Sequence, residues 1–426
     1  MIIYLIEHNM KNKLLILISF IIISIIPEAQ AYDFCATSPT GHTLYYNIIS
    51  SADKPIVEVT SQQTSSPYNL IKPIGDLVIP NSVINNGITY SIELIGDYAF
   101  NDCNRLTSII IPSTITFIGE WAFQYCRGLN SLIIPNSVNS IGIGAFSDCS
   151  DLRTISISNS VSLIDIATFS NCNKLENVVI PNSITTIGDY AFSNCQELIS
   201  IKIPKSVKSI GSFVFDNCFN LKSIIVDRRN KEFSSKDGVL FSKNADTLIC
   251  FPEGKKGAYR IPKSVSIIKE YAFFDCSGLT DIKIPNSVTS IGNNAFSFCN
   301  GLKSMIIPNS VISIGIRAFS NCSLLSSVNI PSSLTSIDSA TFCRCKSLTS
   351  IIIPKSVITI EGYAFYKCER LKSITCESQI PPIINGRKTF YGVNNSTTIF
   401  IPQGSKTKYL LEKSWREFVN IIEKES

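Results

Sequence analysis

The chain has 426 residues, of which 45% are hydrophobic, and 38 Lys and Arg against 33 Asp and Glu give a formal net charge of +5 at pH 7. This balance is mild and the basic residues are scattered along the sequence, so a nucleic-acid partner has no support. Only two histidines are present, His8 and His42, which excludes a His-rich zinc centre.

Residues 1–31 have the features of a secretory signal peptide. Lys11 and Lys13 precede an apolar run at 14–26, and Ala-Gln-Ala at 29–31 is a small-x-small cleavage site. The run is short for a membrane span, and no second run of membrane length follows it. We therefore expect a secreted or cell-surface protein without a membrane span after cleavage. Met1 and Met10 both remain candidates for the start.

Residues 32–75 lack the repeat that fills the rest of the chain. Two apolar segments, at 44–49 and 56–59, alternate as strands do and predict a hairpin. A stack of repeats needs such a cap, because its first coil would otherwise expose apolar side chains. We interpret 32–75 as an N-terminal cap.

Residues 76–376 carry a 23-residue period, which is typical of a solenoid. Most prolines of the repeated Ile-Pro pair lie 23 residues apart, Ser158 replaces one of them, and the gap of 58 between Pro204 and Pro262 marks an insertion. The prolines are Pro112, Pro135, Pro181, Pro204, Pro262, Pro285, Pro308, Pro331 and Pro354.

Each repeat reads L-x-S-I-x-I-P-x-S-V-x-x-I-G-x-x-A-F-x-x-C-x-x, with the leucine as position 1. Isoleucines at positions 4 and 6 share one face of a short strand, and the proline at position 7 ends its hydrogen-bond ladder. The later apolar positions follow neither a period of 2 nor one of 3.6. The pattern predicts a parallel sheet on one face of the solenoid and irregular or 3₁₀ turns on the other.

This repeat resembles the BspA-type leucine-rich repeat family of bacterial surface and secreted proteins, through the core IP-x-S-V-x-x-I-G-x-x-A-F-x-x-C over about 300 residues. The resemblance implies a leucine-rich-repeat solenoid. It also implies a protein ligand, such as a host matrix or plasma protein.

Two irregular segments remain. Residues 227–256 contain apolar runs at 239–241 and 248–251 around a polar turn, which predicts a hairpin-like insertion within the repeats. Residues 377–426 end in a strand at 399–402 and a helix-like segment at 409–422. We interpret 377–426 as a C-terminal cap in which Trp415 and Phe418 cover the last coil.

The sequence shows no catalytic set, metal site or cofactor site. His42 is the one histidine after the predicted signal peptide, and no glycine-rich phosphate loop is present. Asp165 and Asp338 occupy position 14, where most repeats have glycine. We interpret that position as a turn residue that tolerates a positive φ, although Lys269 and Glu361 at the same position indicate that a positive φ is not obligatory. Gly144 is interpreted as a chance neighbour of the repeat glycine Gly142.

Eleven of the fifteen cysteines recur with the repeat. Coils about 4.8 Å apart would place neighbouring cysteines close enough for disulfides. Eleven cysteines cannot all pair, however, and parallel side chains have poorly suited Cβ directions for a disulfide. We expect buried thiols that pack as small apolar groups, with an occasional bridge among Cys35, Cys250, Cys343 and Cys376 left open. The repeated cysteines are Cys103, Cys126, Cys149, Cys172, Cys195, Cys218, Cys276, Cys299, Cys322, Cys345 and Cys368.

Two rows of side chains are candidates for binding. Position 5 points outward from the strand and forms the predicted ligand face. The alternative explanation is that strands favour β-branched residues at this position without any ligand. Position 16 carries aromatic residues that we expect to be half-buried on the back of the coils. The predicted ligand face comprises Ile110, Ile133, Val179, Lys202, Ile225, Lys283, Ile306 and Ile352. The aromatic row comprises Tyr98, Trp121, Tyr190, Phe213, Tyr271 and Tyr363.

These observations favour an adhesin-like protein-binding module rather than an enzyme. An envelope scaffold that associates with itself and binds no soluble ligand is the alternative, and the oligomeric state stays open. Sugar binding by the strand face is disfavoured, because its rows contain no Trp or Tyr platform.

Overall fold

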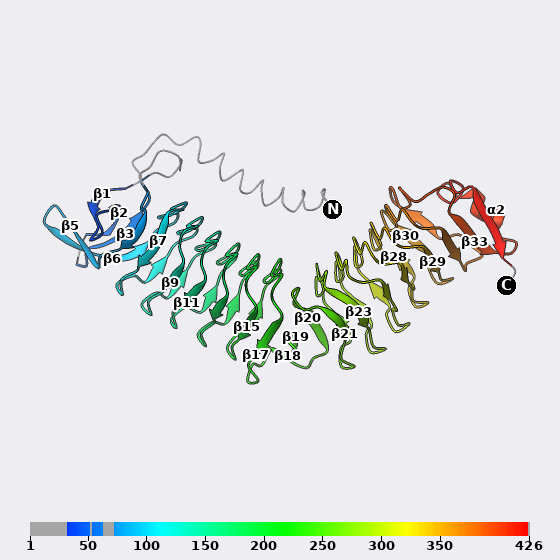
Figure 1. Cartoon of the computed structure of the whole chain (residues 1–426), viewed down its shortest axis with the longest axis horizontal. Helices are drawn as coiled ribbons and strands as arrows, with labels where there is room; N and C mark the ends of the chain where they lie inside the picture. The colour runs from blue at the N-terminus through cyan, green and yellow to red at the C-terminus, as the bar shows by residue number, and fades with distance from the viewer. Residues whose placement is uncertain (1–31, 52, 63–71, 425–426) are drawn as a thin grey trace. The chain divides into compact units, whose positions relative to one another are not determined.

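The computed structural model describes residues 32–51, 53–62 and 72–424 (Figure 1). The predicted signal peptide at 1–31 lies outside the described residues. The chain forms two compact units, Met1–Phe192 and Ser193–Ser426. Both units are stacks of coils joined by parallel strands, with turns on the opposite side, which confirms the predicted leucine-rich-repeat solenoid.

The first unit begins with a sheet of longer strands. β1 pairs antiparallel with β2 and β2 with β3, whereas β3 is parallel to β6. β5 and β6 form a hairpin whose turn residues Asn86 and Gly87 have φ of 50° and 77°, as a tight hairpin turn requires. The strands are β1 (Phe34–Thr37), β2 (Thr43–Ser50), β3 (Ile56–Thr60), β4 (Gly75–Val78), β5 (Ser82–Asn85) and β6 (Ile88–Ile95).

The regular coils of the first unit contain two parallel ladders. One joins β4 to β7 and β9 to β11 and β13, at the start of each repeat. The other joins two-residue strands at positions 12 and 13 and was not expected from the sequence. The strands are β7 (Leu106–Ile110), β8 (Phe117–Ile118), β9 (Ser131–Ile133), β10 (Ser140–Ile141), β11 (Thr154–Ser156), β12 (Leu163–Ile164), β13 (Asn177–Val179) and β14 (Thr186–Ile187).

The second unit repeats this plan on both sides of the insertion. Its first ladder joins β15 to β17, β21 to β23, β25 to β27 and β29 to β31. The strands are β15 (Ser200–Ile203), β16 (Ser209–Ile210), β17 (Ser223–Val226), β21 (Gly257–Arg260), β22 (Ile267–Ile268), β23 (Leu279–Lys283), β24 (Ser290–Ile291), β25 (Ser304–Met305), β26 (Ser313–Ile314), β27 (Ser327–Val328), β28 (Ser336–Ile337), β29 (Ser350–Ile353), β30 (Thr359–Glu361), β31 (Ser373–Cys376) and β32 (Ile383–Asn385).

The inserted segment consists of three antiparallel strands, β18 (Phe233–Lys236), β19 (Val239–Ser242) and β20 (Thr247–Cys250). Asp237 and Gly238 form the first turn with φ of 53° and 78°. β20 then runs parallel to β22, so the insertion rejoins the second ladder of the stack. Phe251, directly after β20, stacks on Phe273 and continues the row of buried phenylalanines.

The carboxyl end differs from the helix-like segment that we predicted. The helix α2 covers only Lys406–Leu411, and β34 (Asn420–Lys424) runs parallel to β33 (Thr398–Pro402). Tyr409 within α2 is buried, and so are Trp415 and Phe418, which lie between α2 and β34. Pairing with β33 satisfies the backbone of 420–424 in a way that an isolated short helix would not, and tertiary pairing therefore overrides the helical pattern.

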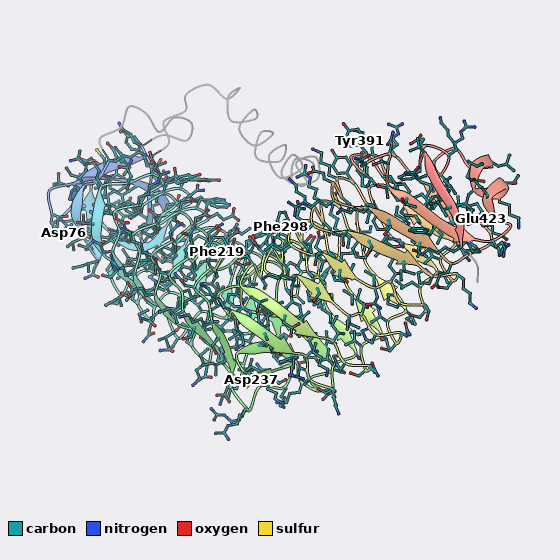
Figure 2. All side chains as sticks on the ribbon, turned by 45° about the vertical axis from the view of Figure 1, so that its right-hand side comes forward. Asp76, Phe219, Asp237, Phe298, Tyr391 and Glu423 are labelled. Atoms are coloured by element: carbon teal, nitrogen blue, oxygen red, sulfur yellow. The ribbon has the colours of Figure 1, made fainter. Side chains whose placement is uncertain are left out.

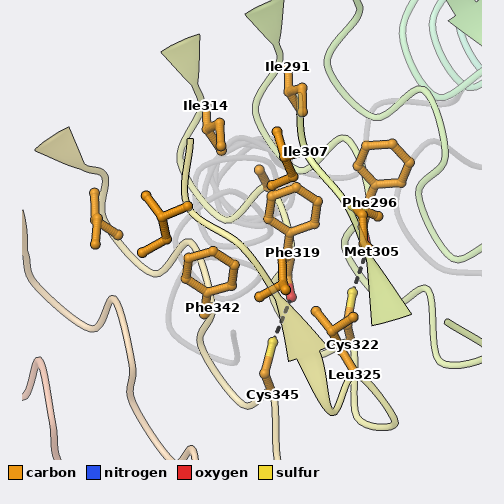
Figure 3. Packing of buried hydrophobic residues seen from close by; sticks show 14 of the residues in the cluster. Ile291, Phe296, Met305, Ile307, Ile314, Phe319, Cys322, Leu325, Phe342 and Cys345 are labelled. Atoms are coloured by element: carbon orange, nitrogen blue, oxygen red, sulfur yellow. Dashed lines mark hydrogen bonds between the residues drawn. The ribbon is translucent and has the colours of Figure 1, made fainter. Parts of the chain in front are cut away.

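Buried phenylalanines and cysteines form two rows along the stack (Figure 3). Phe296, Phe319 and Phe342 stack with ring centroids 5.5 and 5.6 Å apart. Each ladder cysteine in this region donates its S–H to the carbonyl of the phenylalanine one coil back. Examples are the bonds of Cys322 to Phe296 at 3.0 Å and of Cys345 to Phe319 at 3.2 Å. The thiol therefore has a polar partner inside an apolar core.

At position 14, glycine fits a close approach between coils and does not adopt the positive φ that we considered there. Asp165, Lys269, Asp338 and Glu361 show that other residues are also accommodated at this position. A Cβ on Gly142 would lie 2.6 Å from the backbone nitrogen of Glu120 in the preceding coil. Neither Gly142 nor Asp165 at the same position has a positive φ.

Positive φ angles occur instead at positions 16 and 20 of the coils. Trp121 and Tyr125 have φ of 54° and 61°, and their amides donate to carbonyls of the next coil, as does the amide of Phe123 between them. Gly144 occupies position 16 with φ of 59°, and a Cβ there would overlap the Trp121 ring. Gly144 is thus a structural requirement and not a chance neighbour of Gly142.

Candidate binding surface

The predicted ligand face lies on the outward side of the first ladder. Its lysines are exposed, and the strand residues on both sides of each position-5 residue point into the core. The aliphatic members are exposed to 60% at Ile110, 74% at Ile133, 76% at Val179, 48% at Ile225, 78% at Ile306 and 53% at Ile352. Period-2 alternation of the strand produces this arrangement.

Strand register brings some of these residues together. In the first unit Ser156 on β11 pairs with Ile133 on β9 on one side and with Val179 on β13 on the other. In the second unit Lys202 lies opposite Ile225, and Ile352 opposite Thr375. Ile110 pairs only with Val78, Lys283 pairs with Arg260, and Ile306 follows the end of β25.

Position 3 borders this face with short polar side chains. Ser131, Thr154, Ser200 and Ser350 are exposed. Two acids lie in the same row, Asp281 and, in the first coil, Asp76, which pairs with Ser108. Within each unit, a row of short polar side chains therefore runs beside the row of exposed position-5 residues. A flat surface that combines apolar area with hydroxyl groups suits contact with another protein surface.

The aromatic row at position 16 lies on the turn side of the coils, away from the ligand face. Tyr98 is 49% and Tyr363 36% exposed, whereas the other four members are of intermediate exposure. The Phe213 and Tyr271 rings contact each other at 4.3 Å between centroids.

Few side chains among the described residues are suited to catalysis or to binding a metal ion. His42 Nε2 lies 2.9 Å from the Ile74 carbonyl oxygen and Nδ1 lies 3.0 Å from the Thr40 hydroxyl. In the part of the chain that the structure describes, no three His, Cys, Asp or Glu side chains gather as metal ligands would. Among the same residues, no helix combines the length and apolarity needed to cross a bilayer.

All fifteen cysteines are free thiols, and the eleven ladder cysteines are buried. Burial raises the pKa of Cys322 to about 12 and that of Cys149 still further. Since the thiolate is the reactive form, these groups are poor nucleophiles and poor metal ligands at neutral pH.

A cavity of about 80 Å³ lies beside the insertion and was not expected from the sequence. It is lined by residues of two coils, of β19 and β20, and of the segment that follows β20. Phe213, Tyr271 and Phe274 form its aromatic wall, and Asp216 and Glu253 contribute carboxyl groups. Burial, with the nearby Asp216 second, raises the pKa of Glu253 to about 9. No repeat position encodes this cavity, because it exists only where the repeat is interrupted.

Comparisons with known proteins agree with the repeat architecture of the stacked coils. The family model for the BspA type Leucine rich repeat region (6 copies) matches residues 81–178, 164–246, 249–348 and 335–423. The chain belongs to this family. A comparison with curated proteins gave no match.

Solved structures with the same fold include other leucine-rich repeat proteins. A leucine rich cell surface protein from Faecalibacterium prausnitzii A2-165 is 26% identical, with a TM-score of 0.58 over 92% of this chain and 99% of that one. A leucine-rich repeat protein from Eubacterium ventriosum is 24% identical, with a TM-score of 0.62 over 86% and 96% of the two chains. The pneumococcal vaccine antigen PcpA is 20% identical, with a TM-score of 0.57 over 93% and 100%. The last two comparisons show the BspA-type fold alone.

Proposed function

We propose that this BspA-type protein is a secreted or surface-displayed module that binds another protein through its strand face, in the manner of an adhesin. The observation that carries the proposal is the exposure of the aliphatic row. Ile133, Val179 and Ile306 are each about three-quarters exposed on a regular sheet. Isolated exposed aliphatic residues are ordinary, but a repeated row on one face is typical of a contact surface.

The proposal also draws on the predicted signal peptide at 1–31 and on the likeness to a cell surface protein at 26% identity. Binding to a host matrix or plasma protein is the ligand class that we propose. Affinity should be modest, because the predicted ligand face contains no Trp, Tyr or Arg, the side chains that dominate binding energy at protein interfaces, and Arg260 beside Lys283 is the arginine next to it.

The test is capture of matrix and plasma proteins by the purified protein and by two double variants. Ile306→Glu with Ile352→Glu places charge on the strand face, where Lys202 and Lys283 already show that this position accepts a charged residue. Tyr190→Ser with Tyr271→Ser changes the turn side as the control. We expect captured protein to be lost with the isoleucine pair and kept with the tyrosine pair.

Loss of capture only with the tyrosine pair, with both variants folded by circular dichroism, would overturn the assignment of the strand face. Size-exclusion chromatography of the same samples addresses the self-associating scaffold. A protein that captures nothing and elutes as a large assembly would favour that alternative.

A further inference from the structure

Basic side chains that look scattered in the sequence gather on the turn side of the second unit once they are placed in repeat register. Arg344 and Lys367 are the position-20 residues of adjacent coils, and their amides donate to Tyr366 and Tyr391 of the following coils. Arg387 and Lys388 lie one coil beyond Tyr363, whose amide donates to the Arg387 carbonyl. These four cations with Tyr363, Tyr366 and Tyr391 form the surface that we call the basic ridge.

The backbone of the basic ridge is held in an unfavourable conformation. Arg344, Lys367 and Lys388 have φ of 60°, 55° and 58°. Other coils place asparagine at these positions, for example Asn321 and Asn294, or aromatic residues such as Trp121 and Tyr125. Asparagine and glycine tolerate a positive φ better than long side chains do. Turn geometry therefore gives no reason for three cations here.

The cations of the basic ridge have no acidic partner. Among the described residues, no Asp or Glu forms an ion pair with Arg344, Lys367, Arg387 or Lys388. The neighbouring acid Glu361 accepts a hydrogen bond from Asn385. Four unpaired cations on adjacent coils about 4.8 Å apart create a line of positive potential that a linear polyanion can follow.

The tyrosines of the basic ridge disfavour single-stranded nucleic acid as the polyanion. Tyr366 and Tyr391 stack on each other with centroids 5.4 Å apart, and Lys367 and Lys388 lie 5.7 and 5.6 Å from the same two rings. Tyr391 projects from the unit and is 57% exposed (Figure 2). Because the two rings stack on each other and each has a lysine close to it, the ridge offers single-stranded nucleic acid few ring faces on which successive bases could stack.

A protein partner and a second copy of the chain are also disfavoured. Tyr363 and Tyr391 are the exposed large apolar side chains of the ridge, and its other members are four cations and the partly buried Tyr366. In the first unit two of the acids at equivalent positions are already engaged. Asp97 accepts from the Glu120 amide at 2.7 Å, and Asp102 pairs with Lys72 at 2.9 Å.

We propose that the basic ridge binds a linear sulfated polysaccharide. Guanidinium groups form paired hydrogen bonds with oxyanions such as sulfate, and the lysines add charge along the chain. This site lies apart from the strand face and does not depend on the function proposed for it.

The experiment measures binding of the purified protein to heparin oligosaccharide by fluorescence anisotropy at 50 and 200 mM salt. Four cations predict that affinity falls roughly 50–100-fold across this range through counterion release. The test variant carries Arg344→Asn, Lys367→Asn and Lys388→Asn, which suit the local φ and should fold. We expect it to bind at least tenfold more weakly at 50 mM salt.

The matched control carries Lys205→Asn, Lys263→Asn and Lys355→Asn. These exposed lysines occupy position 8, where other repeats have asparagine, so the same charge is removed elsewhere. We expect less than a twofold change. Equal loss in both variants, no loss in the ridge variant, or equal binding of desulfated heparin or of DNA would overturn the proposal. Salt-sensitive self-association that the ridge substitutions abolish would overturn it in favour of a second copy.

Discussion

At the scale of single residues, the repeated cysteine illustrates how one position serves the whole stack. Cys126 and Cys149 are fully buried, and each donates its S–H to a phenylalanine carbonyl at 3.2 Å. An alanine would leave that carbonyl without its side-chain donor, and a disulfide would remove the hydrogen. The geometry therefore accounts for a thiol at this position.

We expect the ladder thiols to be reduced and unreactive in the folded protein. Burial raises the pKa of the ladder cysteine Cys322 to about 12, so little thiolate forms at pH 8. Titration with a thiol reagent should label exposed Cys35 first, and the buried ladder only after unfolding without reductant. Recovery of fewer than half of the ladder thiols after unfolding would show that disulfides form instead.

At the scale of elements, the insertion changes the chemistry of the coils beside it. In a regular coil the position-20 amide donates to a carbonyl of the next coil, as Tyr125 does to Ser147. Asn217 has no such neighbour, and its amide donates instead to Glu253 Oε1 at 3.0 Å. Glu253 Oε2 is buried without a hydrogen-bond partner in the described residues. A backbone acceptor is thus replaced by an acidic side chain.

This replacement predicts a pH-dependent stability. Burial and the nearby Asp216 raise the pKa of Glu253 from 4.5 to about 9 in the folded state. The folded protein therefore binds a proton that the unfolded chain releases, so this contribution to stability is complete below pH 4.5 and is lost as pH rises to about 9. Burial, with Asp275 second, raises the pKa of Asp216 to about 6, which acts in the same direction.

We expect the free energy of unfolding to fall by a few kcal/mol between pH 5 and pH 8, since each unit of pKa shift corresponds to about 1.4 kcal/mol. Glu253→Gln keeps an acceptor for the Asn217 amide and should flatten this dependence while raising stability at pH 8. Glu270→Gln, an exposed residue that lines the same cavity, is the control. Urea denaturation at the two pH values measures both. An unchanged slope in Glu253→Gln would contradict the assignment.

At the scale of the whole molecule, each coil is stabilised by its contacts with the coils on either side. The amide of Phe319 donates to Thr341 and that of Phe342 to Ala364, each at 2.9 Å, and the rings stack in the same order. Every coil therefore contacts mainly its two neighbours, as expected of a repeat protein.

Local stacking predicts a local response to a core substitution. Phe342→Ala removes a fully stacked ring at a cost of about 3–5 kcal/mol. Hydrogen exchange should lose protection most in the coils of Phe319 and Phe365, and progressively less toward the coil of Phe273. The surface variant Ile306→Glu is the control and should leave exchange unchanged. Uniform loss across the second unit would instead indicate one cooperative block.

The repeat, the inward side chains and the outward position-5 row could all be predicted from the amino-acid sequence. A period of 23 residues with fixed apolar positions admits one stacking direction, and strand alternation then decides which side chains face solvent. The family followed from the same pattern.

Only the tertiary structure decided features that depend on neighbouring coils. The clearance at Gly142, the positive φ at Trp121 and the pairing of 420–424 with β33 arise from the next coil or strand. The basic ridge and the carboxyl groups beside the insertion likewise join residues that are 20 or more positions apart in the chain. A local pattern cannot report such distances, because they are set by how coils stack and where stacking is interrupted.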